Sequence, residues 1–229
     1  MPSSRWNAQG NVYLVADDGP LTAERVRAEV GDADGILDVL GSTHDSVEVA
    51  IWNPDGSQAE LSGNGTRIAA AWLMARTGAP AVTVRVGGRE VAARLLDGGM
   101  IEQDVGEVRV GEPEEAAGVR FRAVDVGNPH AVVEGDPAEL PRVGPLLETH
   151  SRFPRRTNVQ VARIVGPGLV EARVWERGVG ETASSGTSAV AVAAALGVSP
   201  ATVRFPGGEL HVRIEEGRAL LTGPAERVG

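Results

Sequence analysis

Two serines stand in matching settings 123 residues apart, and each is followed by small residues that could open a helix. Ser62 leads into Gly63-Asn64-Gly65, and Ser185 leads into Gly186-Thr187. Serine is a common N-cap, so either hydroxyl taken alone is more often structural than catalytic. The glycines shift this balance, because they let a ligand approach bare backbone N–H groups, and a helix N-terminus binds carboxylate or phosphate. Two such serines facing one cleft would suit chemistry that needs a group on each face of a substrate.

The segments around the two serines form an internal repeat. Residues 47–52 match residues 170–175, and each hexapeptide ends at a Trp ten residues before its serine. In both copies the serine is followed by an Ala-rich run, a Thr-Val-Arg strand and a Gly-Gly turn. Four matched elements in the same order are not expected by chance. The repeat therefore predicts a duplicated chain with two similar halves.

A second group of polar residues lies at predicted strand ends and turns. A zwitterionic amino acid needs donors for its carboxylate, acceptors for its ammonium group and a charge pair to orient it. The group offers all three, and its members are Asn11, Asn53, Asn128, His130, Asn158, Glu176, Arg177 and Glu181. Each has an ordinary alternative: an Asn in a turn usually serves backbone geometry, Glu176-Arg177 would also make a surface ion pair, and a histidine is more often packed than catalytic.

Composition excludes several kinds of chemistry. All 22 basic residues are arginine and there is no cysteine, so lysine Schiff bases, pyridoxal phosphate anchored on lysine, thiolate nucleophiles and disulfides are excluded. Four scattered histidines do not predict a metal site. A net charge of -9 argues against nucleic acid as a partner. Without an apolar run of membrane-spanning length or a signal-peptide core, we expect no membrane association and a cytoplasmic location.

The elements that would position these residues are short strands and two Ala-rich helices. The patterns predict strands at 11–16, 47–52, 82–86, 90–95, 107–110, 120–126, 159–165, 170–175, 202–205, 209–214 and 219–221, and helices at 22–30, 68–77 and 187–196. This mixture predicts an α+β fold of two pseudo-symmetric halves, each a sheet wrapped around a central Ala-rich helix.

The sequence places the boundary between the halves in the Gly111-Glu112-Pro113-Glu114-Glu115 stretch. We therefore expect an N-terminal half of residues 1–112 and a C-terminal half of residues 113–216. The last strand, within residues 217–229, is expected to return to the first half.

Taken together, these motifs resemble the diaminopimelate epimerase family. The specific ones are the Glu-Arg-Gly-x-Gly-Glu-Thr run and the Gly-Asn-Pro-His motif. The matching segments are Gly10-Asn11, Ala33-Asp34-Gly35, Asn53-Pro54-Asp55-Gly56-Ser57, Ser62-Gly63-Asn64-Gly65-Thr66-Arg67, Gly127-Asn128-Pro129-His130, Arg152-Phe153-Pro154 with Asn158, and Glu176-Arg177-Gly178-x-Gly180-Glu181-Thr182 leading into Ser185-Gly186-Thr187.

The resemblance implies a cofactor-independent and metal-free reaction in which one α-centre of diaminopimelate is inverted by two bases. In that family a cysteine thiolate removes the α-proton on one face and a cysteine thiol delivers a proton on the other. His130 and Glu181 would support the acid–base pair. Substrate would be held by Asn11, Asn53, Gly63, Asn64, Asn128, Asn158, Glu176, Arg177, Gly186 and Thr187. A homodimer is compatible with the sequence.

The chain departs from this family at the reacting groups, because Ser62 and Ser185 occupy both cysteine positions. A thiol, with an ordinary pKa of about 8.5, is brought into the working range by a helix N-terminus. A serine hydroxyl titrates far higher and needs an adjacent base to act. Three interpretations stay open: engineered serines, natural serines activated by His130, Glu181 or water, and a binding cleft without racemisation. A phenazine-biosynthesis-type isomerase with Glu60 or Glu181 as base is the alternative enzyme, and an amino-acid-binding protein is the non-enzymatic alternative.

Overall fold

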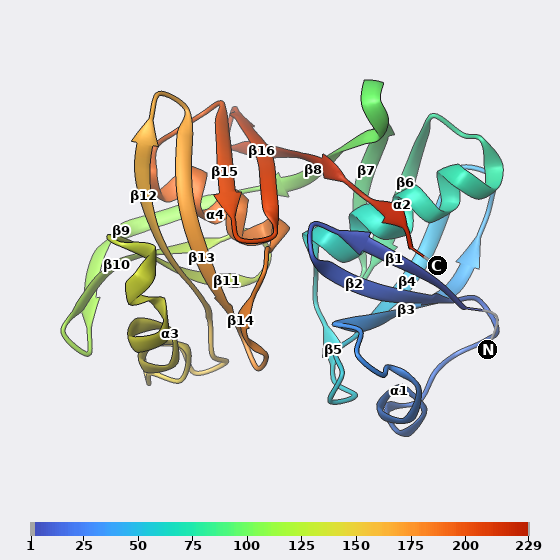
Figure 1. Cartoon of the computed structure of the whole chain (residues 1–229), viewed down its shortest axis with the longest axis horizontal. Helices are drawn as coiled ribbons and strands as arrows, with labels where there is room; N and C mark the ends of the chain where they lie inside the picture. The colour runs from blue at the N-terminus through green and yellow to red at the C-terminus, as the bar shows by residue number, and fades with distance from the viewer. Residues whose placement is uncertain (1–2, 229) are drawn as a thin grey trace. The chain divides into compact units, whose positions relative to one another are not determined.

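The computed structural model describes residues 3–228, which form two compact units (Figure 1). Unit 1 consists of Met1–Asp104 and Thr222–Gly229, and unit 2 consists of Val105–Leu221. The chain passes from unit 1 to unit 2 within strand β8 (Met100–Glu107) and returns within β17 (Arg218–Pro224).

Unit 1 holds a long helix, a short helix and a set of strands. The long helix is α2 (Gly63–Thr77) and the short one is α1 (Ala23–Glu29), which Thr22 caps by accepting the backbone N–H of Arg25 at 3.3 Å. The other elements are β1 (Ser3–Ala8), β2 (Asn11–Ala16), β3 (Gly35–Ser42), β4 (Ser46–Trp52), β5 (Gln58–Ala59), β6 (Ala81–Val86), β7 (Arg89–Leu95), the 3-10 turn η1 (Asp97–Gly99) and β18 (Glu226–Arg227).

Unit 2 is built to the same plan. Its Ala-rich helix is α4 (Gly186–Leu196), and a second helix, α3 (Leu140–Glu148), follows the 3-10 turn η2 (Pro137–Glu139). The strands are β9 (Arg109–Ala116), β10 (Val119–Asp125), β11 (Pro129–Glu134), β12 (Asn158–Gly166), β13 (Leu169–Glu176), β14 (Gly180–Thr182), β15 (Ala201–Phe205) and β16 (Gly208–Glu215).

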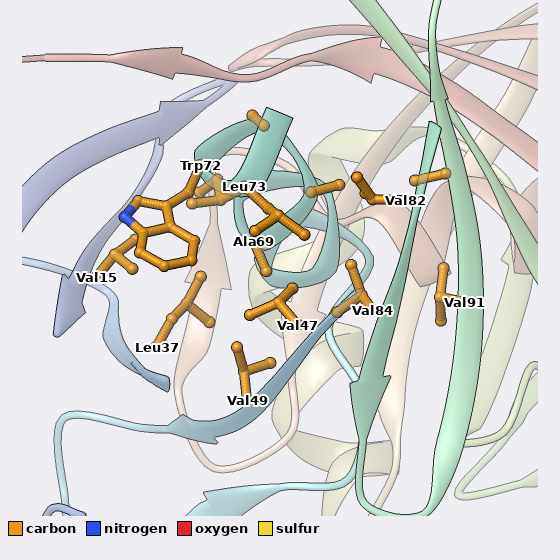
Figure 2. Packing of buried hydrophobic residues seen from close by; sticks show 14 of the residues in the cluster. Val15, Leu37, Val47, Val49, Ala69, Trp72, Leu73, Val82, Val84 and Val91 are labelled. Atoms are coloured by element: carbon orange, nitrogen blue, oxygen red, sulfur yellow. The ribbon is translucent and has the colours of Figure 1, made fainter. Parts of the chain in front are cut away.

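Helix α2 lies inside the strands of unit 1. Every residue from Gly63 to Met74 is buried, and Figure 2 shows Ala69, Trp72 and Leu73 directed at valines of the surrounding strands. From Ile68 to Met74 the helix is apolar on every side, and such a segment is buried rather than amphipathic; its alanines let strands approach closely. Gly78, in the left-handed conformation with φ of 76°, ends the helix.

Helix α4 occupies the same place in unit 2. Its residues from Gly186 to Ala193 are buried and pack against Val170, Ala172 and Val174 of β13. Gly197, again left-handed with φ of 66°, ends it. The predicted fold class, an α+β chain of two similar halves around Ala-rich helices, is therefore confirmed.

The strand register allows single residues of unit 1 to be matched to single residues of unit 2. β2 runs parallel to β3 with Tyr13 opposite Gly35, and β11 runs parallel to β12 with His130 opposite Asn158. The second strand of each pair is followed by an antiparallel partner with a tryptophan at or next to its end, and Ile36 lies opposite Trp52 as Val159 lies opposite Trp175. Tyr13 of unit 1 thus occupies the place that His130 occupies in unit 2.

The proposed seam between the halves has a different structure from the one expected. Residues 111–115 lie inside β9, which pairs antiparallel with β10 and places Pro113 opposite Arg122. The register of this pair shifts between Arg122 and Val124, and proline is tolerated in strands at such irregularities. The two units divide instead between Asp104 and Val105 and between Leu221 and Thr222. β18 pairs with β1, with Trp6 opposite Arg227.

Gly144 gives a test of how closely α3 packs against the sheet. A Cβ added there would lie 2.8 Å from Cγ of Trp175. Although alanine is normally the better helix former, we expect Gly144→Ala to lower the free energy of unfolding by about 1–3 kcal/mol, because the indole must move. Urea unfolding measures the change.

The matched control is Gly41→Ala, since a Cβ at Gly41 meets no atom within 4 Å. Equal or higher stability of Gly144→Ala relative to this control would contradict the packing of α3 against Trp175.

Candidate functional site: two buried helix N-termini

Ser62 caps α2 and anchors its first turn. Its backbone is extended, with φ of -135° and ψ of 119°, and its Oγ accepts the backbone N–H of Gly65 at 3.0 Å. Its carbonyl accepts the Thr66 backbone N–H at 2.8 Å and the Thr66 hydroxyl at 2.9 Å. A Cβ at Gly65 would lie 3.2 Å from the Ser62 Cβ and 3.3 Å from Leu37. The glycine therefore lets the helix begin against the core.

Asn64, in the first turn of α2, has its amide oriented by a buried arginine. Its Oδ1 accepts Nη2 of Arg67 at 2.9 Å, so its Nδ2 is directed toward Oδ1 of Asn11 at 3.5 Å. Arg67 also donates from Nε to the Pro224 carbonyl at 2.9 Å. Complete burial lowers the pKa of Arg67 to about 9, which still leaves it charged at neutral pH. The structure thus brings Asn11 and Asn64 together at the start of α2.

A second amide from a strand stabilises the same turn. In the orientation that satisfies its neighbours, the Gln103 amide nitrogen donates to the Gly63 carbonyl at 3.0 Å. Its oxygen accepts the Thr66 hydroxyl at 2.7 Å and the Arg67 backbone N–H at 3.0 Å. Gln103 is fully buried. It was not predicted from the sequence, because Glu102 and Asp104 flank it and nothing in this polar run marks Gln103 as buried.

Ser185 occupies the corresponding position before α4, but its side chain behaves differently. Its backbone is extended, with φ of -150° and ψ of 128°, and its carbonyl accepts the Ala189 backbone N–H at 3.0 Å. The side chain is 5% exposed and makes no capping hydrogen bond. The first-turn amides of Gly186 and Thr187 are therefore donors that the Ser185 hydroxyl does not use.

His130 lies in a chain of buried polar side chains beside α4. One ring nitrogen, Nε2, lies 2.8 Å from Oδ1 of Asn128, and the other, Nδ1, lies 3.0 Å from Nε2 of Gln160. Because the Gln160 amide nitrogen is a donor, Nδ1 accepts and Nε2 carries the proton. Asn128 then donates to the Thr187 hydroxyl at 3.4 Å, and Gln160 donates to the Ser188 hydroxyl at 2.9 Å. These hydrogen bonds link His130 to two residues in the first turn of α4.

This environment keeps His130 neutral. Burial is the main cause that lowers its pKa to about 3 from 6.5, and the charge of Arg177 adds to the shift. Since both ring nitrogens already have partners, the ring holds no free lone pair for a substrate proton. His130 is placed to orient Asn128 and the start of α4.

The loop after β13 is tied down by Asn158. Its Oδ1 accepts the Arg177 backbone N–H at 3.0 Å, and its Nδ2 donates to the Pro129 carbonyl at 3.0 Å. Glu176 accepts the Thr182 hydroxyl at 2.6 Å. The Arg177 guanidinium donates to the Arg155 carbonyl at 3.4 Å. The structure therefore brings Asn158 and Arg177 together, and holds Glu176 next to β14.

Glu176 and Glu181 lie on opposite faces of the sheet. Side chains alternate along a strand, so Glu176 shares the face of Val174 and Ala172, which pack on α4. Glu181 pairs in register with Trp175, which packs on the α3 side. There Glu181 is exposed and accepts both Nε and Nη2 of Arg173 at 2.7 Å. The structure does not bring Glu181 to the α4 face on which Ser185 was expected to need it.

Asn53 and Glu60 lie in the connection between β4 and α2. The Asn53 amide donates to the Ser57 hydroxyl at 3.0 Å, and its backbone N–H donates to the Ser57 carbonyl at 2.8 Å. Asn53 thus orders this turn, and its predicted contact with substrate stays a prediction. Glu60 is exposed.

Tyr13 is a site residue that sequence reasoning missed. Its hydroxyl lies 3.4 Å from Oγ of Ser62. Tyr13 follows Asn11 by two positions, just as His130 follows Asn128, so an Asn-x-Tyr and Asn-x-His pair was visible in the sequence. The pair escaped notice because its spacing to the serine differs between the halves. Gln160 and Ser188 were also missed as partners of His130.

Among residues 3–228 no group of three or more histidine or carboxylate side chains is arranged to hold a metal ion. Within the same range, no helix is long and apolar enough to cross a membrane.

The neutral state of His130 predicts a pH dependence of stability. Between pH 6.5 and about 3 the unfolded chain binds a proton on this ring that the folded chain does not. The free energy of unfolding therefore falls as the pH is lowered through this window, and His130 accounts for about 2 kcal/mol of loss between pH 7 and pH 5. Urea unfolding of the native chain and of His130→Gln at both pH values measures it.

His44→Gln, at an exposed position, is the control and should keep the native dependence. The assignment of a neutral buried ring is wrong if His130→Gln loses as much stability on acidification as the native chain.

Comparison with known proteins identifies the family of the chain. The family model for diaminopimelate epimerase matches residues 122–228. The diaminopimelate epimerase of Desulforudis audaxviator is 38% identical over 273 residues, covering 100% of this chain and 97% of the relative. That of Pelotomaculum thermopropionicum is 37% identical over 228 residues, covering 86% and 81%.

Solved structures agree on the fold. A predicted epimerase from Pseudomonas aeruginosa superposes with a TM-score of 0.81 at 18% identity, covering 99% of this chain and 96% of that one. A probable proline racemase from Agrobacterium radiobacter, with bound carbonate, gives a TM-score of 0.73 at 17% identity, covering 99% and 91%. The sequence relatives, which cover 86% and 100% of this chain, then decide the family: this chain belongs to the diaminopimelate epimerase family of isomerases.

Proposed function

We propose that the chain is a cofactor-independent cytoplasmic epimerase that converts LL-diaminopimelate to meso-diaminopimelate by two-base proton transfer at the α-carbon. Ser62 and Ser185 stand in the two acid–base positions. The observation that carries the proposal is that each serine is the N-cap residue of a buried helix. The names of the curated relatives support the choice of substrate.

The reacting α-carboxylate would bind at the helix N-termini. First-turn amides and the helix dipole favour an anion at such a position. At α4 the amides of Gly186 and Thr187 are not used by the Ser185 side chain, and at α2 Asn64 is oriented by Arg67. Asn11 and Asn128 stand beside these two turns in unit 1 and unit 2.

The distal end of the substrate carries a second ammonium and a second carboxylate. Arg177 offers a cation for the distal carboxylate, and Asn158 fixes its backbone by accepting the Arg177 N–H. Glu176, which the sequence assigned to the distal ammonium, is assigned instead to the reacting end, because it shares the α4 face of β13. Arginine presents a planar fork that suits a carboxylate. In this proposal the loop after β13 binds the distal amino-acid end of the substrate. Asn53, in the turn after β4, is a further substrate-binding residue.

Serine in both positions sets an upper limit on the rate. A thiol is far more acidic than an alcohol, so the thiol family moves an α-proton with a group that ionises readily. A serine hydroxyl transfers a proton only if a neighbour shares the charge. We therefore expect slow epimerisation from the native chain.

The experiment is incubation with LL-diaminopimelate in D2O, following α-deuterium by NMR and meso product by chiral chromatography. We expect slow exchange in the native chain and a gain of about 100-fold or more when both Ser62→Cys and Ser185→Cys are introduced, because a thiol supplies the acid–base function directly.

Ser184→Cys is the matched control, since Ser184 is a buried neighbour of Ser185 that is not the N-cap residue of α4. It should not increase exchange. If the double cysteine variant folds and binds diaminopimelate but gains no exchange, Ser62 and Ser185 are not the acid–base positions.

We further propose Glu176, rather than Glu181, as the carboxylate that acts near α4. The alternation of β13 and β14 supports it, because Glu176 shares the α4 face whereas Glu181 is paired with Arg173 on the other. We expect Glu176→Gln to lower α-proton exchange in the double cysteine variant by about 100-fold, and Glu181→Gln to leave it nearly unchanged. Exchange rates in D2O measure both, and a larger loss from Glu181→Gln would reverse the assignment.

A further inference from the structure

Tyr13 is the residue of unit 1 that the strand register matches to His130 of unit 2. Tyr13 on β2 and His130 on β11 each stand two positions after an asparagine and opposite the first residue of the next parallel strand, which is Gly35 or Asn158. In unit 2 both ring nitrogens of His130 already have amide groups as hydrogen-bond partners. In unit 1 the equivalent ring carries a phenol hydroxyl 3.4 Å from Ser62 Oγ.

Close packing fixes the phenol ring of Tyr13 in this position. Tyr13 is 6% exposed. A Cβ at Gly35 would lie 2.6 Å from Cε1 of Tyr13 and 2.5 Å from the Trp52 carbonyl oxygen. Gly35 is therefore required for the ring to lie against β3. The fixed ring determines where its hydroxyl is held.

The Ser62 hydroxyl has hydrogen-bonding capacity left for this contact. A serine hydroxyl has one hydrogen and two acceptor positions. Gly65 N–H occupies one acceptor position at 3.0 Å, which leaves the hydrogen and the second lone pair. The contact with Tyr13 is long for an O–H···O hydrogen bond, and catalytic hydrogen bonds are often long in an unliganded site and shorten when substrate binds.

We propose that Tyr13 is a proton relay for Ser62, so that the phenol, acting through the serine hydroxyl, exchanges the proton that reaches or leaves the substrate α-carbon on the Ser62 face. This inference rests on the proposed epimerase function. Tyr13 acts through Ser62 and is a positioning residue.

The relay solves the difficulty that serine creates. When Ser62 acts as the acid, its Oγ–H bond breaks, the proton forms a C–H bond with the substrate carbanion, and the Tyr13 O–H proton moves to Ser62 Oγ. The negative charge of the carbanion ends on the phenolate oxygen, and Ser62 is restored as a neutral hydroxyl. In the opposite direction the phenolate takes the Ser62 proton while Ser62 takes the α-proton. A phenol, with an ordinary pKa of about 10, carries this charge far more readily than an alcohol.

The two faces of the reaction are therefore unequal. The Ser62 side has a phenol relay, whereas the residue equivalent to Tyr13 on the Ser185 side is a neutral histidine with no free ring nitrogen. Glu176 is the group that shares a sheet face with α4 on that side. This difference predicts that removal of the phenol affects one face only.

The kinetic test is Tyr13→Phe, which keeps the ring, in two backgrounds. With Ser62 present we expect α-proton exchange in D2O to fall by about 100-fold. In the Ser62→Cys background we expect almost no loss, because the thiol needs no relay. An equal loss in both backgrounds would assign Tyr13 a structural role, and no loss in the Ser62 background would overturn the relay.

A spectroscopic test is independent of turnover, because Tyr13 is the sole tyrosine of the chain. Its phenol absorbance can be titrated in the native chain, in Ser62→Ala and in Thr77→Val, which removes a hydroxyl at the far end of α2. A hydrogen bond to an ionised group is stronger than one to a neutral group, so loss of Ser62 should move the titration midpoint to higher pH.

Thr77→Val should leave the midpoint unchanged. A midpoint that Ser62→Ala also leaves unchanged overturns the relay. If no variant exchanges the α-proton at all, the epimerase function fails, and the titration alone decides whether Tyr13 and Ser62 share a proton.

Discussion

A helix that begins inside a protein must find partners for its first backbone N–H groups, and this constraint organises both units. The first four N–H groups of a helix have no intrahelical acceptor, and in α2 and α4 the whole first turn is buried. Burial without partners would be costly for each group. Several buried polar residues of each unit therefore lie around the first turn of its central helix, Asn11 and Gln103 in unit 1 and Asn128 and Gln160 in unit 2.

The two units meet this constraint in different ways. In unit 1 the Ser62 hydroxyl accepts the Gly65 N–H, and Gln103 braces the turn from the neighbouring strand through the Gly63 carbonyl, the Thr66 hydroxyl and the Arg67 N–H. In unit 2 the histidine, asparagine and glutamine chain reaches the hydroxyls of Thr187 and Ser188, and Ser185 makes no capping bond. The two units thus share the same arrangement of strands around a central helix, whereas the hydrogen bonds around the two serines differ.

The features that could be predicted from the sequence are those that depend on local chemistry. The Ala-rich runs, their Ser-Gly starts and the glycines that end them predicted α2 and α4, because capping and burial both act within one element. α3 was missed because Pro141, Gly144 and Pro145 argue against a helix locally, whereas packing of Gly144 against Trp175 favours it. Most of β9 was missed for a similar reason: the strand expected at 107–110 covers only its start, and Pro113 in the rest is typical of a turn.

The parts of the site that could not be predicted depend on register. A shift of one residue reverses the face of every side chain on a strand. The motif that contains both Glu176 and Glu181 therefore does not say which of them lies on the sheet face that packs on α4. The pairing of Trp175 with Glu181 decides it. Tyr13 is a similar case: its chemistry is visible in the sequence, but its distance from Ser62 depends on β2 pairing with β3 opposite Gly35.

The exchange of cysteine for serine is easier to understand from the cap than from the reaction. A serine hydroxyl is one of the best N-cap acceptors, so Ser62 satisfies the start of α2 by the same atom that would have to release a proton. While a proton passes through Ser62, the negative charge that develops on its Oγ lies next to the Gly65 N–H and the positive end of the helix dipole, both of which stabilise negative charge. The cap interaction and the acid–base interaction therefore favour the same charge at the same atom, and the structural role of Ser62 lowers the cost of its chemical one.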